Sequence, residues 1–412
     1  RTERAGIDSA ASEVSDKATS AHQATRFMAL YTLAMAGGAI AYVPFLTVLL
    51  PVRITGMAGD SDVQWLAYVT FTGAIAASLG NIAFGWLSDI TGSRRMWILA
   101  GLVLSSILLV NFAHVERLNT LIALILAWQL SLNMMLGPLG AWAGDCVPDH
   151  QKGMLGGLLA FSPALGALSG AFITLPGLVG PDARLWLVAV LVCVCVLPVL
   201  LFGQPVKFPE LHDSAAPVQV TADQSRRARR LVVRMWVARL LIQISEAALF
   251  AYLYFWFRSV DTAMGPSNTA QVLSLVLVAA IPAAMITGKW ADRQGRPIFP
   301  LAVCAAFSNI GLAAMAVSFS LTTAIAAYVV FGLATTVFLS LHTGQTLRVL
   351  PKPHRRGRDL GIFNLTNTGP SLVMPWIVLA LVPVFGFPIL LALLACLTLA
   401  ACVLLLTLGD LR

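Results

Sequence analysis

One acidic residue, Glu246, lies in the middle of the apolar run between residues 235 and 257. Arg239 lies seven residues before it and Gln243 lies between them, so the three side chains share one face of a helix. A charged group at the centre of a membrane helix costs about 2.5–3.5 kcal/mol and marks a functional site by default. We therefore expect Glu246 to bind and release a proton or to bind a cationic solute, with Arg239 as an anion anchor nearer the cytoplasm.

Each of these residues also has a structural interpretation. Glu246 could be a permanently neutral or hydrogen-bonded strut between helices, and Arg239 could extend to the membrane surface. Helical side chains lean toward the N-terminus, so Glu246 leans toward Arg239 while Arg239 leans away from it. A direct ion pair within the helix is therefore not expected. An unpaired carboxylate is costly to bury, which is the condition that a reversible proton site needs.

Other polar residues lie at a similar depth in the apolar runs. Gln129 and Asn133 are four residues apart near the middle of the run 118–142, where they could bind a polar solute or join two helices. Thr335 is also at mid-depth, although threonine often bonds the backbone of its own helix. His342 lies nearer the cytoplasm.

Helices in a membrane must position these groups. Of 412 residues, 58% are hydrophobic and 11% are charged, against about 25% charged residues in soluble domains. Lipid must therefore solvate the chain. Apolar runs long enough to cross a bilayer lie at 27–51, 62–87, 96–114, 118–142, 152–176, 184–203, 235–257, 268–290, 297–319, 322–347, 359–383 and 386–408. The sequence thus predicts twelve spans.

The positive charges predict the orientation of these spans. With the N-terminus in the cytoplasm, 22 of the 27 Lys and Arg residues fall in cytoplasmic segments and four fall on outer loops. This split follows the positive-inside rule, and the opposite topology would invert it. We therefore expect both termini to be cytoplasmic and the protein to lie in the inner membrane of a bacterial cell.

A hairpin motif occurs twice at a nearly constant spacing. Residues Gly85 to Arg95 place an acid, a glycine and two arginines between apolar runs, and Gly288 to Pro297 repeat this pattern 203 residues later. A second pair of loops, 147–157 and 353–361, aligns at an offset of 204. The chain therefore contains two six-helix halves with the same internal plan. Subtracting 204 from Glu246 gives Tyr42, which we expect either across the pseudo-symmetry axis from Glu246 or as a packing residue.

The hairpin, its second copy and the twelve spans resemble the Major Facilitator Superfamily over about residues 25–410. The resemblance implies an all-α membrane protein with two pseudo-symmetric six-helix bundles around a central cavity. The corresponding division is a tail at 1–25, bundles at 26–203 and 233–412, and a cytoplasmic linker at 204–232. Drug/proton antiporters of this family carry an arginine in helix 4, and some sugar carriers carry acids in helices 1 and 2. Neither feature is present here.

We assign the hairpin residues to conformational control, because ion pairs and helix-end contacts there could hold the cytoplasmic side shut in one state. The eleventh span also has a polar face beside proline and glycine, which is typical of a bent gating helix or of packing against helix 2 or 8. The resulting gating candidates are Asp89, Arg94, Arg95, Asp292, Arg293, Arg296, Asn364 and Asn367.

The sequence contains no phosphate-binding, hydrolytic or metal-ligand motif, so we expect no enzyme activity, cofactor or metal. We predict a monomeric secondary transporter that moves a small organic solute by alternating access with proton coupling. Its partners would be that solute, protons and membrane lipids, with no nucleic acid.

Two alternatives remain within transport, namely proton-driven multidrug efflux and uptake of a nutrient or siderophore. A lipid-handling protein or a non-transporting receptor is an alternative of another class. A dry, apolar cavity would favour that class, whereas a cavity lined by Glu246, Gln243, Gln129 and Asn133 would favour solute transport.

Overall fold

A computed structural model describes residues 22–148, 151, 155, 158–159, 161–181, 183–206, 222–294, 298–349 and 356–407. Nearly all of these residues are helical, and no strand occurs among them. The predicted tail at 1–25 therefore lies largely outside the described residues, as do residues 207–221 of the predicted linker and Arg296.

In the first half of the chain, the described residues form six helical segments. They are α2 (Thr25–Pro44) continued by η1 (Phe45–Leu49) and α3 (Leu50–Ala58), then α4 (Asp62–Thr91), α5 (Arg94–Asn111), α6 (Leu118–Cys146), α8 (Phe161–Ile173) and α9 (Ala183–Phe202). Short turns η2 (Gly59–Ser61) and η3 (Phe112–His114) follow α3 and α5. The second half contains α10 (Ala222–Val260), α11 (Pro266–Gln294), α12 (Phe299–Ala316), α13 (Leu321–Val349) and α14 (Arg356–Leu406).

Within the described ranges, nine helical stretches are long and apolar enough to cross a membrane. Two of them contain a break at a glycine with positive φ, which residues with a side chain rarely adopt: Gly59 (φ 55°) separates α3 from α4, and Gly386 (φ 75°) divides α14. The shorter apolar helix α8 adds another pass. This arrangement is consistent with the twelve predicted spans.

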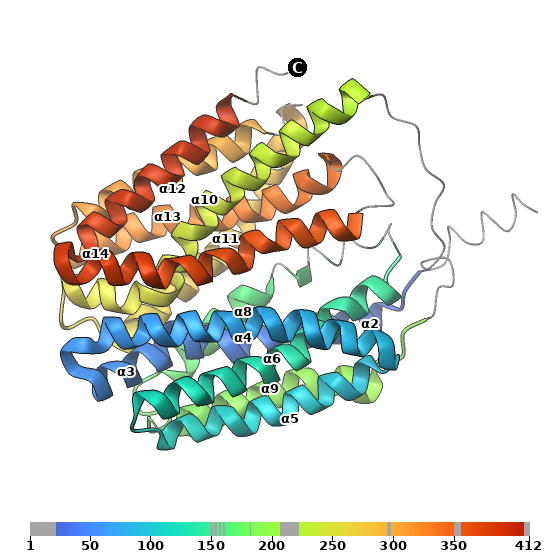
Figure 1. The fold of residues 1–412 in the computed structure, drawn as a ribbon, viewed down its shortest axis with the longest axis horizontal. Helices are drawn as coiled ribbons and strands as arrows, with labels where there is room; N and C mark the ends of the chain where they lie inside the picture. The colour runs from blue at the N-terminus through green and yellow to red at the C-terminus, as the bar shows by residue number, and fades with distance from the viewer. Residues whose placement is uncertain are drawn as a thin grey trace, which may run out of the picture.

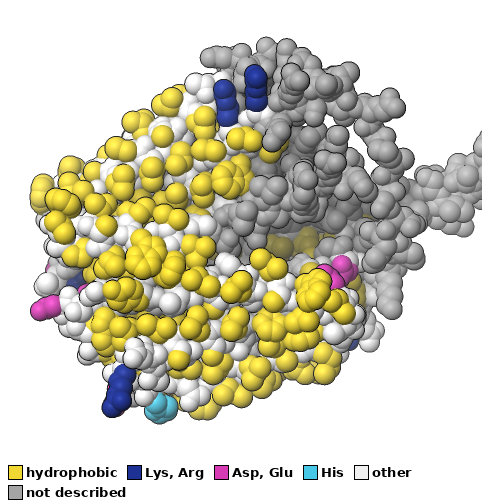
Figure 2. All heavy atoms as spheres, in the orientation of Figure 1, with side chains coloured by type: hydrophobic (Ala, Val, Ile, Leu, Met, Phe, Trp, Pro, Cys, Tyr) yellow, Lys and Arg dark blue, Asp and Glu magenta, His cyan; other side chains and the backbone are white. Residues whose placement is uncertain are grey.

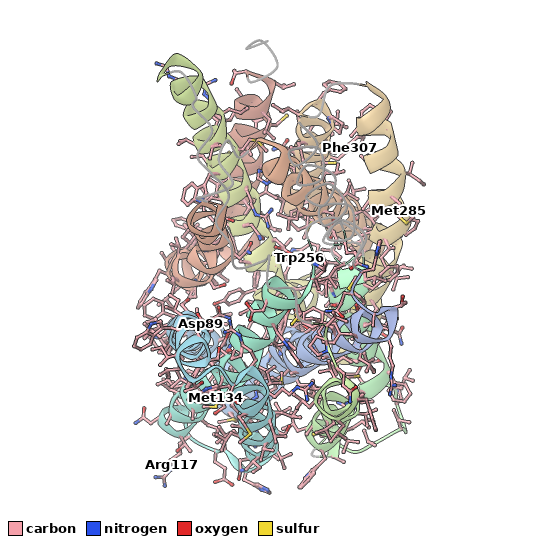
Figure 3. All side chains as sticks on the ribbon, turned by 90° about the vertical axis from the view of Figure 1, so that its right-hand side faces the viewer. Asp89, Arg117, Met134, Trp256, Met285 and Phe307 are labelled. Carbon is pink, nitrogen blue, oxygen red and sulfur yellow. The ribbon has the colours of Figure 1, made fainter. Side chains whose placement is uncertain are left out.

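The helices form two groups (Figure 1). Helices α2 to α9, drawn from blue to green, pack mainly on one another, and α10 to α14, drawn from yellow-green to red, do the same. Figure 3 shows the same two groups from the side, with Asp89 in the first group. Small residues allow close packing inside each group: a Cβ atom at Gly101 of α5 would lie 2.4 Å from the Met135 backbone of α6, and one at Gly311 of α12 would lie 2.6 Å from the Phe331 backbone of α13.

The two groups meet along α4 with α14 and along α8 with α11. The rings of Phe71 and Trp376 lie 4.9 Å apart across the first interface. Across the second, the Ser274 hydroxyl donates to the Ala167 carbonyl at 2.7 Å. We call the end of the molecule with the α4–α5 turn at Gly92 the hairpin end, and the end with Gly59 and Gly386 the opposite end. Both of these contacts lie toward the opposite end.

The outer surface has the pattern of a protein solvated by lipid. On the face shown in Figure 2, hydrophobic side chains cover the middle of the molecule, and the coloured charged side chains lie near its ends. Large exposed side chains on α4 include Leu79, Ile82 and Trp86, each at least 61% exposed. Such exposure of adjacent apolar side chains in water would be exceptional, so the surface supports the multi-pass membrane protein that the sequence predicts.

Candidate functional site

A cavity of about 340 Å³ lies where the two groups of helices meet. Its walls come from α2, η1, α3, α4 and α6 on one side and from α10 and α14 on the other. Proline residues interrupt the helical hydrogen bonds in two of these walls: Pro44 precedes the π-helical segment η1, and Pro375 lies inside α14. The polar residues of the lining are Tyr42, Thr70, Ser78, Gln129, Gln243, Glu246, Tyr252, Asn367 and Ser371.

Glu246 lines this cavity from α10 and is partly buried. Tyr42 lines it from α2, and its ring lies 6.3 Å from that of Phe250, which is one turn beyond Glu246. The structure therefore brings Tyr42 and Glu246, which the repeat offset relates, to one cavity between the two halves. Among the described residues, Glu246 has no salt-bridge partner within 4 Å.

Arg239 does not line the cavity. Its Nε donates to Thr366 Oγ1 at 3.1 Å, and its Nη2 donates to Asn367 Oδ1 at 3.3 Å, so it is attached to α14. Its Nη1 lies 3.4 Å from His342 Nδ1 of α13. Arg239 thus joins three helices of the second group, and Asn367, predicted as a gating residue, connects it to the cavity wall.

Gln129 and Asn133 have different surroundings despite their shared helix face. Gln129 lines the cavity, whereas Asn133 is packed behind it against α4, where Asn81 Nδ2 donates to Asn133 Oδ1 at 3.3 Å. Asn133 Nδ2 in turn donates to the Gln129 carbonyl at 2.9 Å. Asn133 therefore joins two helices and orients its neighbour.

Thr335 and His342 of α13 are both buried and lie away from the cavity. Thr335 donates to the Phe331 carbonyl of its own helix at 2.7 Å and lies 3.2 Å from the Ser308 hydroxyl of α12. His342 Nε2 lies 2.9 Å from the Met235 carbonyl. Because a guanidinium can only donate, His342 Nδ1 accepts from Arg239, and Nε2 carries the hydrogen that it donates to Met235.

Tyr252 is a cavity residue that the sequence shows only as a member of the aromatic run at the end of its span. Its side chain is 1% exposed, and its hydroxyl faces Thr70 without a hydrogen-bond partner of ordinary geometry. A buried hydroxyl without a partner is unusual. An interfacial aromatic belt explains most of this run, which leaves one or two of its rings to cap the cavity.

At the hairpin end, Arg94 forms ion pairs with Asp89 and with Asp145, the latter at 3.0 Å. Arg95 donates to the Gly203 carbonyl, and its guanidinium lies 5.5 Å from the ring centroid of Trp142. These contacts join α4, α5, α6 and the residue after α9, all within the first group of helices. Asp145 was missed, although an acid at the end of the fourth span was a usable signal.

The second copy of the hairpin is less fully described. Asp292 and Arg293 belong to α11 and Asn364 to α14, but their side chains lie outside the described residues. Their predicted gating role therefore stays a prediction, as does that of Arg296.

At the opposite end an ion pair crosses between the groups. Arg258, near the end of α10, donates to Asp62 Oδ2 of α4 at 3.2 Å, and Asp62 also accepts from the Thr55 hydroxyl at 3.0 Å. Arg258 lies over the rings of Tyr254 and Phe255. The sequence contains no signal for this pair, because its members are 196 residues apart.

No cluster of three or more metal-ligating side chains is present in the part of the chain that the structure describes. The cavity also contains no nucleophile–base pair among its lining residues. Its acid, amides, hydroxyls and aromatic rings can bind a small polar solute and exchange a proton.

Comparisons with known proteins agree with this architecture. The family profile of the Major Facilitator Superfamily matches residues 27–353 and 235–411. No curated protein matches the chain. A crystal structure of a mutant of the nucleoside transporter NupG superposes with a TM-score of 0.67, at 12% sequence identity, and the match covers 92% of this chain and 99% of that one. The structural likeness shows the fold, and the profile covers most of the chain. The protein is therefore a member of the Major Facilitator Superfamily of membrane transporters.

Proposed function

We propose that the protein is a secondary transporter that moves a small organic solute by alternating access, with Glu246 as the proton-coupling group. The observation that supports this proposal is the position of Glu246 in a cavity between the two halves that has polar groups on both walls, without a salt-bridge partner for Glu246 among the described residues. A carboxyl group in such a place can change its protonation as the halves move, because its exposure to water changes with them.

The polar lining favours solute transport over lipid handling. Three of the four residues that distinguish these possibilities, namely Glu246, Gln243 and Gln129, line the cavity, and Asn133 orients Gln129 from behind. A site that binds an acyl chain would expose mainly aliphatic groups. Here the acid and the amides lie beside aromatic rings, as in sites that orient a small polar molecule.

The positions at which the two halves touch support alternating access. Asp62–Arg258, Phe71–Trp376 and Ser274–Ala167 join them toward the opposite end. We take this arrangement as the state that is closed at the predicted outer side. Rocking of the halves would break these contacts and expose the cavity there.

The first experiment identifies a substrate and tests the role of Glu246. Purified protein is screened by thermal shift against neutral, cationic and anionic solutes, with nucleosides included because the NupG transporter shares the fold. Uptake of each binder into proteoliposomes is then measured with and without a pH gradient. We expect the gradient to stimulate uptake by the wild type.

Glu246→Gln should remove this stimulation, because glutamine has the shape of glutamic acid but cannot exchange a proton. Solute counterflow without a gradient should persist, since it needs binding and movement of the halves but no proton transfer. Glu116→Gln provides the control, because Glu116 is an exposed acid that does not line the cavity. Wild-type stimulation by the pH gradient in Glu246→Gln would falsify the coupling role.

A further inference from the structure

The orientation of the Gln243 amide is fixed by Arg239 through Asn367. Arg239 Nη2 lies 3.3 Å from one polar atom of the Asn367 side chain, and a guanidinium can only donate. That atom is therefore Oδ1, and the ambiguity that usually affects an amide is removed. Gln243 bonds the same atom at 2.7 Å, so it must donate through Nε2.

This hydrogen bond determines what Gln243 presents to a ligand. With Nε2 committed to Asn367, the remaining polar atom is Oε1, which makes no hydrogen bond to another described group. Gln243 and Glu246 are three residues apart on one face of α10, and both line the cavity. The α10 wall therefore offers a carbonyl acceptor next to the carboxyl group.

On the α6 wall the Gln129 amide has the opposite orientation, with its nitrogen rather than its oxygen available to a ligand. Asn133 donates to the backbone carbonyl of Gln129, which can only accept, so the donating atom of Asn133 is Nδ2. The same Nδ2 lies 3.5 Å from Gln129 Oε1. Gln129 Nε2 therefore points away from Asn133 and toward α4, where it would lie 3.7 Å from a Cβ atom on Gly73, another lining residue.

The two walls thus differ in hydrogen-bonding character, although they come from equivalent halves. The α6 wall presents an amide donor, and the α10 wall presents acceptors. The lining contains no lysine, arginine or histidine among the described residues, and Arg239 is attached to α14 behind the wall. A carboxylate or phosphate ligand would therefore meet Glu246 and the Gln243 oxygen without a cation in the cavity to balance them.

We propose that the cavity selects an uncharged or cationic solute. This solute carries an N–H or O–H group that donates to Gln243 and Glu246, and a carbonyl or ring nitrogen that accepts from Gln129. Arg239 is then a positioning residue that acts through Asn367, and it does not bind the solute. This inference rests on the proposed transport function and deepens it by naming the substrate class. The aromatic rings of Tyr42 and Phe250 favour a flat solute beside the polar groups.

Matched probes test the substrate class. The panel pairs nicotinamide with N,N-dimethylnicotinamide and uracil with 1,3-dimethyluracil, since each methylated partner lacks every N–H donor but keeps the ring and the carbonyl acceptor. Nicotinate and orotate are the anionic counterparts. Binding to the full-length protein in detergent is measured by thermal shift and isothermal titration. We expect a donor-bearing neutral probe to bind about tenfold or more tightly than its methylated and anionic partners, the effect of one well-placed hydrogen bond.

The outcomes separate the inference from the proposed function. Equal binding of a methylated partner, or preference for an anion, overturns the substrate class while leaving transport in place. A panel in which no probe binds, with no uptake of any of them, overturns both.

Variants of Asn367 test the positioning role. Asn367→Asp keeps an oxygen for both Arg239 and Gln243, so the preference for the donor-bearing probe should stay within about threefold of the wild type. Asn367→Leu removes the acceptor and releases the Gln243 amide, so the preference should fall by about tenfold. Arg239→Gln should lower it in the same direction, because a glutamine at position 239 cannot fix the amide as a guanidinium does.

The preference between matched probes is the readout that a purely structural role would leave unchanged. Gln271→Leu, an exposed glutamine of α11 outside the cavity, is the control. Loss of thermal stability in Asn367→Leu with an unchanged preference would show that the network only supports the fold, and the positioning role would be overturned.

Discussion

The two ends of the molecule use ion pairs in different ways. At the hairpin end, Arg94 joins Asp89 and Asp145, which belong to the same half as Arg94 itself. At the opposite end, Arg258 of the second half pairs with Asp62 of the first. A pair inside one half survives any movement of that half as a rigid body, whereas a pair between halves must break when they separate. The first kind stabilises a bundle, and the second stabilises a conformational state.

Two arginines near related positions of the repeat sharpen this contrast. Adding the offset of 204 to Arg53 gives 257, next to Arg258. Arg53 Nη2 donates to the carbonyls of Ala113 and Val115, in the segment between α5 and α6 of its own half. Arg258 instead crosses to Asp62. The duplicated halves have thus come to use similar side chains for internal packing in one case and for contact between the halves in the other.

The largest effect on folding stability is expected for Arg94→Ala. The Arg94 side chain is 14% exposed, and besides its two ion pairs it donates to the Ser88 hydroxyl at 2.5 Å and the Gly85 carbonyl at 3.3 Å. Loss of these ion pairs and hydrogen bonds should lower the free energy of unfolding by about 2–3 kcal/mol. The effect is no larger because the acidic partners of Arg94 are partly solvated. Thermal unfolding in detergent measures the effect.

Arg117→Ala is the control for that experiment, because Arg117 is exposed and belongs to no ion pair among the described residues. Its melting temperature should match that of the wild type. If Arg94→Ala were as stable as this control, the contacts of Arg94 would have no role in holding α4, α5 and α6 together.

Arg258→Ala should change the balance of conformations more than the stability of either half. The Asp62 side chain is 10% exposed and would keep only the Thr55 hydroxyl. Loss of a charged hydrogen-bond partner at a buried carboxylate costs about 1–3 kcal/mol, which can shift a two-state equilibrium by about tenfold. Spin labels on Gln64→Cys of α4 and Asn268→Cys of α11, two exposed positions at this end, report the separation of the halves. The exposed native Cys396 is replaced in this background.

We expect a larger population at long label distances in Arg258→Ala, and a return toward the wild-type distribution when Asp62→Arg is combined with Arg258→Asp. Arg94→Ala provides the comparison between the ends, since it should leave the distances unchanged. An unaltered distribution in Arg258→Ala would mean that the ring and hydroxyl contacts of α4–α14 and α8–α11 close this end by themselves.

The sequence predicts the fold well because a lipid bilayer permits few backbone conformations. Apolar runs must be helices, since their backbone groups have no other partners in the bilayer. The repeat then relates the halves, and its offset links Tyr42 with Glu246, which line one cavity in the structure. These inferences need only periodicity and spacing, which are properties of the chain itself.

The partners of individual polar side chains could not be predicted in the same way. Arg239 has the charge expected of an anion anchor, but its side chain extends from α10 toward α14, where it donates to Thr366 and Asn367. Thr335 is at the depth of the cavity, yet it faces Ser308 on α12. In a helix that is apolar on most sides, the sequence gives the depth of a residue but only weakly its direction, which depends on neighbouring helices far away in the chain.

The smallest effect is expected for Asp89→Asn, which tests how much each of the two acids, Asp89 and Asp145, contributes to the stability that Arg94 provides. The Asp89 side chain is 59% exposed, against 40% for Asp145, so water already screens much of its attraction to Arg94. The substitution should lower the free energy of unfolding by about 0.5 kcal/mol or less, since Arg94 keeps Asp145. Asp145→Asn should cost more, because Asp145 also joins a third helix.

A double-mutant cycle between Asp89→Asn and Arg94→Ala isolates this pair, with the melting temperature as the measured quantity. A coupling energy as large as the whole effect of Arg94→Ala would contradict this division, and Asp89 would then be the main partner of Arg94. A small coupling energy together with impaired transport would instead assign Asp89 to the movement of the halves. Its contribution would then arise in a state in which the hairpin end is closed, where its exposed oxygen could bond the other half.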